Sequence, residues 1–165
     1  MDNNLSNSNP RLASEQTHVE QFETDVVLRD GSLVHVRPVR PEDHALLTSF
    51  IEGLTPKTFG LRFSDAPRPE EANNGLVPNV DQFALLAMRE EMVIGHALFT
   101  VSIPDKAELT VVVADAYQGK GLGTILLGQL TQAAIANGIS EFEAYVTPEN
   151  APILQVVREL GFPTV

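Results

Sequence analysis

The chain has 165 residues, 22 acidic and 11 basic side chains, a formal net charge of -11, and no cysteine. This length predicts one domain with a sizeable core, and a hydrophobic content of 43% is typical of globular proteins. The charge excludes nucleic-acid and membrane partners, because no basic stripe is present to bind phosphates. Without cysteine there is no disulfide or thiolate ligand, and the four histidines are isolated, so no metal site is expected.

The N-terminal segment, residues 1–22, is rich in Asn and Ser and is expected to be a flexible tail before one domain at residues 23–165. It lacks the basic start and the apolar stretch of a signal peptide. No apolar run in the chain approaches the roughly 18 residues of a membrane span. The expected location is therefore the cytoplasm.

The first half of the chain is expected to form a hairpin, two helices and a long loop, over residues 25–37, 41–53, 55–63 and 64–80. Asp30-Gly31 lies between two runs of alternating apolar and polar residues, which is a hairpin signal. Pro41 suits the first turn of a helix. The spacing of apolar residues in that helix predicts a buried stripe of Ala45, Leu46, Phe50 and Leu54.

The second half is expected to form three antiparallel strands and then a helix, a strand and a helix, over residues 82–89, 92–103, 107–114, 121–137, 140–147 and 151–160. Glu90-Glu91 and Pro104-Asp105 supply the turns between the three strands.

The segment from Val111 to Thr124 carries the chemistry. A buried strand enters a loop with three glycines in five residues, Gly119, Gly121 and Gly123, and a long helix begins there. Unpaired N–H groups at such a helix start, with the helix dipole, can bind a pyrophosphate, and Lys120 adds a positive charge. The alternative is that the glycines only allow a tight turn. Their spacing matches neither the Rossmann nor the Walker pattern.

Glu108 lies ten residues before Gln118, in the strand that leads to the glycine loop. Alternation places it on the opposite face of that strand from Leu109, Val111 and Val113. Apolar residues on both faces indicate a central strand, so a carboxylate near its start is expected at a sheet mouth or in a cleft, where it can act as a general base. The alternative is a solvated glutamate at a strand end.

The run Gln118-Gly-Lys-Gly-Leu-Gly123 fits the acyl-CoA signature Q/R-x-x-G-x-G/A, and over about residues 25–162 the chain resembles the GNAT N-acetyltransferase superfamily. The resemblance implies an α/β (α+β) fold: a mixed, mostly antiparallel sheet flanked by helices, with a strand that splays at the acyl-CoA site. Within the superfamily, the closer resemblance is to bacterial protein lysine acetyltransferases that act on acyl-CoA synthetases. That similarity is carried by Leu28-Arg-Asp-Gly-Ser, Val36-Arg-Pro, Leu61-Arg-Phe63, Ala107-Glu108 and Asp115-Ala-Tyr-Gln-Gly.

By position, the resemblance implies that Glu108 is the catalytic base and that acetyl-CoA is the co-substrate. The implied acetyl-CoA-binding residues are Val111, Val112, Val113, Gln118, Gly119, Lys120, Gly121, Leu122, Gly123, Thr124 and Asn150. Asn150 can equally be the N-cap of the last helix. The implied partner is a protein with an exposed lysine, such as an acyl-CoA synthetase. A small-amine acetyltransferase and a non-catalytic acyl-CoA-sensing module remain as alternatives.

Two features depart from the family pattern. Val157 stands where many GNAT enzymes have a tyrosine general acid, so no acid is assigned. The chain also stops three residues after Gly161-Phe162, where the family continues through a final β-hairpin. The expectation is that the domain was cut from a longer multidomain protein, because domains of this subgroup are commonly fused to a synthetase-like or cyclic-nucleotide-binding domain.

Overall fold

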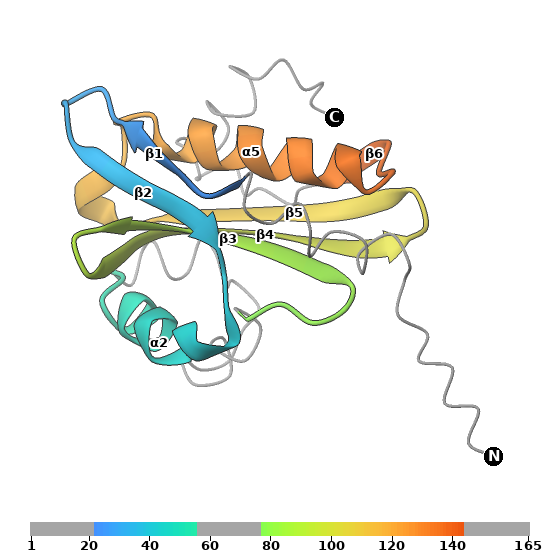
Figure 1. Cartoon of the computed structure of the whole chain (residues 1–165), viewed down its shortest axis with the longest axis horizontal. Coiled ribbons are helices and arrows are strands. Elements are labelled where there is room, and N and C mark those ends of the chain that lie inside the picture. Colours follow the sequence, from blue (N-terminus) through green and yellow to red (C-terminus); the bar gives the residue numbers. More distant parts are fainter. Residues whose placement is uncertain (1–21, 56–76, 144–165) are drawn as a thin grey trace.

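The computed structural model describes residues 22–55 and 77–143 (Figure 1). Within these ranges six strands form one sheet in chain order: β1 (Thr24–Val27), β2 (Leu33–Pro38), β3 (Gln82–Arg89), β4 (Met92–Ile103), β5 (Lys106–Val113) and β6 (Glu141–Glu143). All neighbouring strands are antiparallel except β5 and β6, which are parallel. The predicted mixed, mostly antiparallel sheet is confirmed.

Two α-helices in the described ranges cover opposite faces of this sheet (Figure 1). Helix α2 (His44–Glu52) follows a 3-10 turn, η3 (Pro41–Asp43), and helix α5 (Leu122–Ala136) follows another, η4 (Asp115–Tyr117). Helix α5 lies within one residue of both predicted ends, and α2 ends one residue before its predicted end, but the predicted first turn of α2, residues 41–43, is the 3-10 turn η3. Neither helix is long and apolar enough to cross a membrane, and no other helix in the described ranges is.

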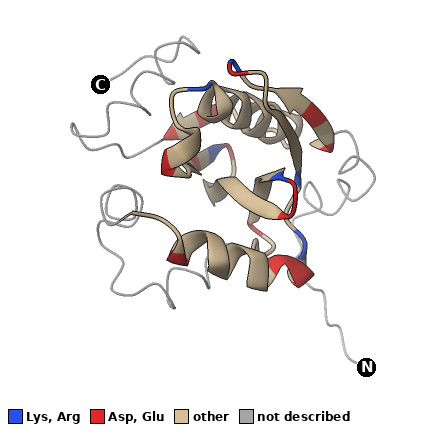
Figure 2. Ribbon diagram, turned by 90° about the vertical axis from the view of Figure 1, so that its left-hand side faces the viewer, with Lys and Arg blue, Asp and Glu red and all other residues tan. Residues whose placement is uncertain are grey.

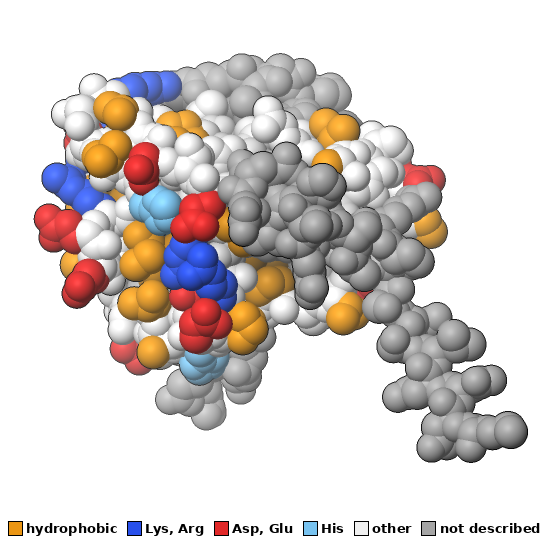
Figure 3. Space-filling view, in the orientation of Figure 1, with side chains coloured by type: hydrophobic (Ala, Val, Ile, Leu, Met, Phe, Trp, Pro, Cys, Tyr) orange, Lys and Arg blue, Asp and Glu red, His pale blue; other side chains and the backbone are white. Residues whose placement is uncertain are grey.

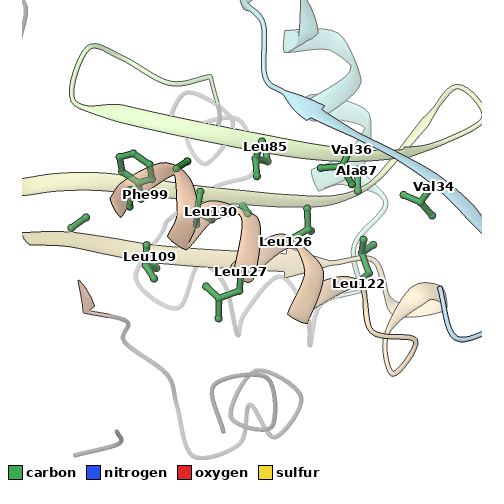
Figure 4. Packing of buried hydrophobic residues seen from close by; sticks show 14 of the residues in the cluster. Val34, Val36, Leu85, Ala87, Phe99, Leu109, Leu122, Leu126, Leu127 and Leu130 are labelled. Atoms are coloured by element: carbon green, nitrogen blue, oxygen red, sulfur yellow. The ribbon is translucent and has the colours of Figure 1, made fainter. Parts of the chain in front are cut away.

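The larger part of the core lies between α5 and the sheet (Figure 4). Four leucines of α5 are buried there: Leu122, Leu126, Leu127 and Leu130. They belong to one cluster with buried residues of β2 to β5, namely Val34, Val36, Leu85, Ala87, Phe99 and Leu109. Burying each such side chain stabilises the fold by about 1.5–3 kcal/mol, so the leucines fix α5, and with it the glycine loop, against the strands.

The opposite face of the sheet packs against α2. Its buried helix residues are Leu47, Phe50 and Ile51, so only part of the predicted stripe is confirmed. Ala45 is exposed, and that prediction was wrong, because the helix follows the i, i+3, i+4 pattern that starts at Leu47. Val112 of β5 is buried in the same cluster, which places the even-numbered residues of β5 on the α2 face.

The predicted hairpin at Asp30-Gly31 is confirmed. Gly31 has φ +86°, the left-handed conformation that glycine adopts without strain, and its N–H donates to the Leu28 carbonyl at 2.9 Å. The predicted strand at 140–147 is described only over β6. The predicted helices at 55–63 and 151–160, Asn150, Val157, most of the loop at 64–80 and almost all of the tail lie outside the described residues.

A buried ion pair joins β2 to the start of α2. The Arg37 guanidinium donates to both oxygens of Asp43, at 2.8 and 2.7 Å, and the Arg40 N–H donates to the same carboxylate. Asp43 is only 2% exposed. The hydrogen bond from Arg37 lowers the pKa of Asp43 despite the cost of burial. Asp43 therefore links the sheet to the start of the helix.

Two glycine substitutions should change stability in opposite directions. A Cβ on Gly95 of β4 would lie 3.0 Å from Leu126 Cδ1 and 3.3 Å from Leu122 Cδ2, whereas a Cβ on Gly128 of α5 would meet nothing within 4 Å. We expect Gly95→Ala to destabilise the protein by about 1–3 kcal/mol through overpacking. Gly128→Ala should stabilise it by about 0.5–1 kcal/mol through helix propensity. Urea unfolding measures both changes, and a Gly95→Ala protein as stable as the parent would contradict this packing.

His35 of β2 makes a pH-dependent contact with two carboxylates. Histidine, acidic and basic side chains also lie close together on the face of the molecule shown in Figure 3. Its ring nitrogens lie 2.7 Å from Asp25 and 3.0 Å from Glu23, and these hydrogen bonds, chiefly that of Asp25, raise the pKa of His35. Because the pKa of His35 is raised, the stabilisation of the folded protein by this contact is complete below the ordinary pKa of 6.5. It is lost as the pH rises through the folded-state pKa of His35.

We therefore expect His35→Gln to destabilise the protein at about pH 5 and to have little effect at about pH 9. The effect at low pH should stay below about 1 kcal/mol, because all three side chains are more than a third exposed. Unfolding free energies of both proteins at the two pH values test this. The same loss at both values would show that the contact does not depend on protonation.

Candidate active site

The glycine loop turns the chain from β5 into α5 through two left-handed residues. Gly119 has φ +75° and Gly121 has φ +93°, conformations that other residues adopt only with strain. The side-chain amide of Gln118 donates to the Val113 carbonyl at 3.0 Å and so ties the loop to the end of β5. The structure thus places the predicted loop residues together between the strand and the helix.

Helix α5 begins directly at this loop, with Gly121 as its N-cap residue. The Ile125 N–H donates to the Gly121 carbonyl at 3.1 Å as the first bond of the helix. N–H groups earlier in a helix have no intrahelical acceptor, and the dipole of a 15-residue helix adds positive potential at the same point. No acidic residue occupies the first turn of α5. The helix start is therefore suited to an anion.

The tip of the β1–β2 hairpin contacts the same loop, which sequence reasoning missed. The Arg29 N–H donates to the Lys120 carbonyl at 3.0 Å, and the Lys120 ammonium lies 2.9 Å from Asp30. Hydrogen bonds from Ser32 and Lys120 hold the pKa of Asp30 well below its usual range. Figure 2 looks onto this end of the molecule and shows basic and acidic residues side by side. The positive charge that Lys120 was expected to add to the loop is therefore partly offset by its ion pair with Asp30.

Tyr117 lies beside the glycine loop. Its ring is 5.2 Å from the Lys120 ammonium and 5.8 Å from the Arg89 guanidinium. Asp115, at the start of η4, accepts a hydrogen bond from the Thr55 hydroxyl at 2.9 Å. This bond ties the segment between β5 and α5 to a residue three positions after the end of α2.

Glu108 lies on the α2 face of β5, as alternation predicts, since its neighbours Ala107 and Leu109 are buried against the α5 side. It pairs in register with Thr100 of β4 and with Glu143 of β6. Within the described residues Glu108 is exposed, so the predicted cleft is not formed by them. The strand-end position near the start of β5 is confirmed.

The β5 strand links Glu108 to the glycine loop. About five residues of extended chain, or about 17 Å, separate Glu108 from Val113. Along this stretch one edge of β5 is paired with β4, while the described pairing with β6 covers only Lys106–Glu108. Val111 and Val113 contact the α5 side of the core, and Val112 contacts the α2 side. Their backbone contacts to a pantetheine arm stay a prediction.

A central strand that ends in a glycine loop at the start of a helix is the arrangement of acyl-CoA-dependent N-acetyltransferases. A sequence model of the Acetyltransferase (GNAT) family matches residues 48–162, which is more than half of the chain, and the chain belongs to this family. It is therefore a GNAT N-acetyltransferase.

Several relatives share this fold and sequence pattern. An acetyltransferase of Pseudomonas aeruginosa is 28% identical over 82% of this chain and 77% of its own length. The acetyltransferase Pat of Mycolicibacterium smegmatis is 28% identical over 82% of this chain, but this chain spans only 43% of that relative. The crystal structure of the GNAT domain of S. lividans PAT is 30% identical, with a TM-score of 0.78 over 86% of this chain and 88% of that domain.

A further match shows the fold alone. PaiA N-acetyltransferase from Thermoplasma acidophilum, solved in complex with coenzyme A, is 19% identical with a TM-score of 0.63 over 80% of this chain and 91% of that one. The fold is therefore shared with a protein of low sequence identity. The predicted fold and family are both confirmed.

Proposed function

We propose that this chain transfers an acetyl group from acetyl-CoA to a lysine amine of a protein. The observation that carries the proposal is that β5 joins a solvent-facing carboxylate, Glu108, to the left-handed glycines at the start of α5. The resemblance to the GNAT domain of S. lividans PAT and to the acetyltransferase Pat supports the choice of a protein acceptor.

In this proposal the residues from Gln118 to Thr124 hold the pyrophosphate of acetyl-CoA. Gly119 has no atom within 4 Å of the position of a Cβ, so the loop backbone is open to a ligand there, whereas the corresponding position at Gly121 is in contact with the Arg29 side chain. The first turn of α5 supplies N–H donors and the positive end of the dipole. The pantetheine arm would then extend along the backbone of Val111–Val113 toward Glu108, with Asn150 predicted beside it.

These residues can carry out a direct transfer of the acetyl group from the thioester to the lysine nitrogen. Lysine has a pKa near 10.4 in water, so its ammonium must lose a proton before it can attack. Glu108 accepts that proton, through a water, and the neutral nitrogen attacks the thioester carbonyl. The C–N bond forms, the C–S bond breaks, and the second proton lost by the nitrogen passes to the departing thiolate, through water, to give coenzyme A as the thiol. A strand N–H near Val112 or Val113 polarises the carbonyl oxygen.

The charges around Glu108 favour a cationic acceptor. Glu143 lies opposite Glu108 on β6, and Glu141 lies two residues earlier on that strand. Lys106 is 3.4 Å from Glu143 and 3.9 Å from Glu141. With a net charge of -11, the surface should attract a lysine within a basic region, such as one on an acyl-CoA synthetase. A small amine is the second candidate acceptor, since it would meet the same charges.

The Gly121→Asp variant tests the pyrophosphate site. We expect it to abolish acetyl-CoA binding in calorimetry, because it places a carboxylate where the phosphates should bind. Gly138→Asp is the matched control, since Gly138 also has a positive φ, of +81°, but lies beyond the opposite end of α5. Thermal unfolding of both variants measures the strain that they share. Unchanged affinity in a folded Gly121→Asp protein would show that the loop does not hold the cofactor.

A further inference from the structure

We propose that Arg29, in the turn between β1 and β2, binds the pyrophosphate of acyl-CoA from outside the glycine loop. The inference rests on the proposed function, because it assigns a further binding residue to the same site. Arg29 is far from the loop in sequence, and the structure brings the two together.

The position of the Arg29 side chain is defined by Gly121. A Cβ on Gly121 would lie 3.5 Å from Arg29 Nε, 3.8 Å from Cγ and 3.9 Å from Cδ. The stem of the arginine and the start of its guanidinium therefore lie against the N-cap residue of α5. From there the guanidinium can reach an anion held by the first turn of the helix.

The hairpin tip is held firmly in this position. The Arg29 N–H donates to the Lys120 carbonyl at 3.0 Å, and Asp30 forms an ion pair with the Lys120 ammonium. The Ser32 N–H donates to Asp30 at 2.9 Å, and its hydroxyl accepts from Arg89 at 3.0 Å. Such contacts lower the entropy lost when a ligand binds, because the backbone that carries Arg29 is already ordered.

The electrostatics of the helix start favour an anion between Arg29 and α5. The N-terminus of a helix stabilises negative groups and disfavours cations. Here two cations, Arg29 and Lys120, lie at that end and no acidic residue occupies the first turn of the helix. Asp30 offsets the charge of Lys120. The potential at this end of the helix therefore favours an anion within reach of Arg29.

Arginine suits this role better than lysine. Its planar guanidinium presents paired donors that match two phosphate oxygens, and it stays charged at all relevant pH values. Hydrogen bonds to charged groups commonly change affinity by about 10- to 100-fold. This range is the expected contribution of Arg29 to acetyl-CoA binding.

Calorimetry with Arg29→Gln tests the inference, using acetyl-CoA, its 3′-dephospho form and S-acetylpantetheine as ligands. We expect affinity for the first two to fall by about 10- to 100-fold, while affinity for S-acetylpantetheine, which lacks phosphate, stays unchanged. Arg29→Lys should lose less affinity for the first two ligands, since lysine keeps the positive charge. Arg40→Gln is the control, because Arg40 is an exposed arginine whose ion pair is with Glu23.

Three results would overturn the inference. Equal losses for all three ligands would show that Arg29 only supports the fold of the loop. A loss confined to acetyl-CoA would assign Arg29 to the 3′-phosphate. Unchanged binding of acetyl-CoA to Arg29→Gln would remove the residue from the site but leave the proposed function intact. Failure of the unmodified protein to bind acetyl-CoA would instead refute the proposed function.

Discussion

Replacing Glu108 with Gln is expected to slow acetyl transfer by about 10²- to 10⁴-fold, the usual contribution of a general base. The amide keeps the size and hydrogen-bonding capacity of the side chain but cannot accept the proton of the lysine ammonium. Acetyl-CoA binding should stay nearly unchanged, because the proposed pyrophosphate site lies at the other end of β5. Steady-state acetylation rates and calorimetry of the same preparations measure the two effects.

Glu143→Gln is the matched control for this prediction. Glu143 lies opposite Glu108 in the register of β5 and β6, so its loss removes a similar charge from the same region. If only the local negative charge mattered, both variants would slow to a similar extent. Raising the pH should partly restore the Glu108→Gln rate, because more of the acceptor lysine is then neutral. Near-normal turnover, or lost acetyl-CoA binding, would remove Glu108 from the mechanism.

Asp43→Asn is expected to destabilise the protein by about 3–5 kcal/mol, because it leaves the Arg37 guanidinium buried without its carboxylate. A loss of this size is a large fraction of the stability of an ordinary domain. Glu42→Gln is the control, since Glu42 is the exposed neighbour in the same turn and should change the unfolding free energy by less than about 0.5 kcal/mol. Urea unfolding at neutral pH compares the two variants.

The same ion pair predicts how the protein responds to acid. Because Arg37 lowers the pKa of Asp43, the stabilisation is present above the ordinary value of 3.8 and is lost as the pH falls through the folded-state pKa. Stability of the unmodified protein should therefore decline in acid more steeply than that of Asp43→Asn. Parallel acid dependence of the two proteins would show that Asp43 is not ionised in the folded state.

Local signals in the sequence predicted much of the fold. Asp30-Gly31 predicted the hairpin, and the alternation of side chains predicted the face of β5 that carries Glu108. The glycine run predicted the start of α5. Each of these features depends on residues close together in the chain. Turn chemistry and side-chain alternation act over a few residues, so they can be recognised without tertiary information.

The features that were missed depend on contacts between distant segments. The pairing of Asp43 with Arg37 and the contact of Arg29 with the glycine loop need β2, α2 and α5 to be placed in space first. The ion pair of Lys120 with Asp30 likewise changed the charge expected on the loop. The buried stripe of α2 was predicted only in part for a different reason: more than one set of apolar residues has near-helical spacing, and packing selected the set that includes Leu47.

Transfer of a labelled acetyl group tests the proposed activity most directly. The protein is incubated with acetyl-CoA carrying a ¹³C-labelled acetyl group and with an acyl-CoA synthetase, and the products are analysed by mass spectrometry. We expect label on lysine side chains of the acceptor, with one coenzyme A released for each acetyl group transferred. Binding of acetyl-CoA without transfer of label to any lysine would contradict protein lysine acetylation, and label on an added small amine alone would assign the chain to that acceptor class.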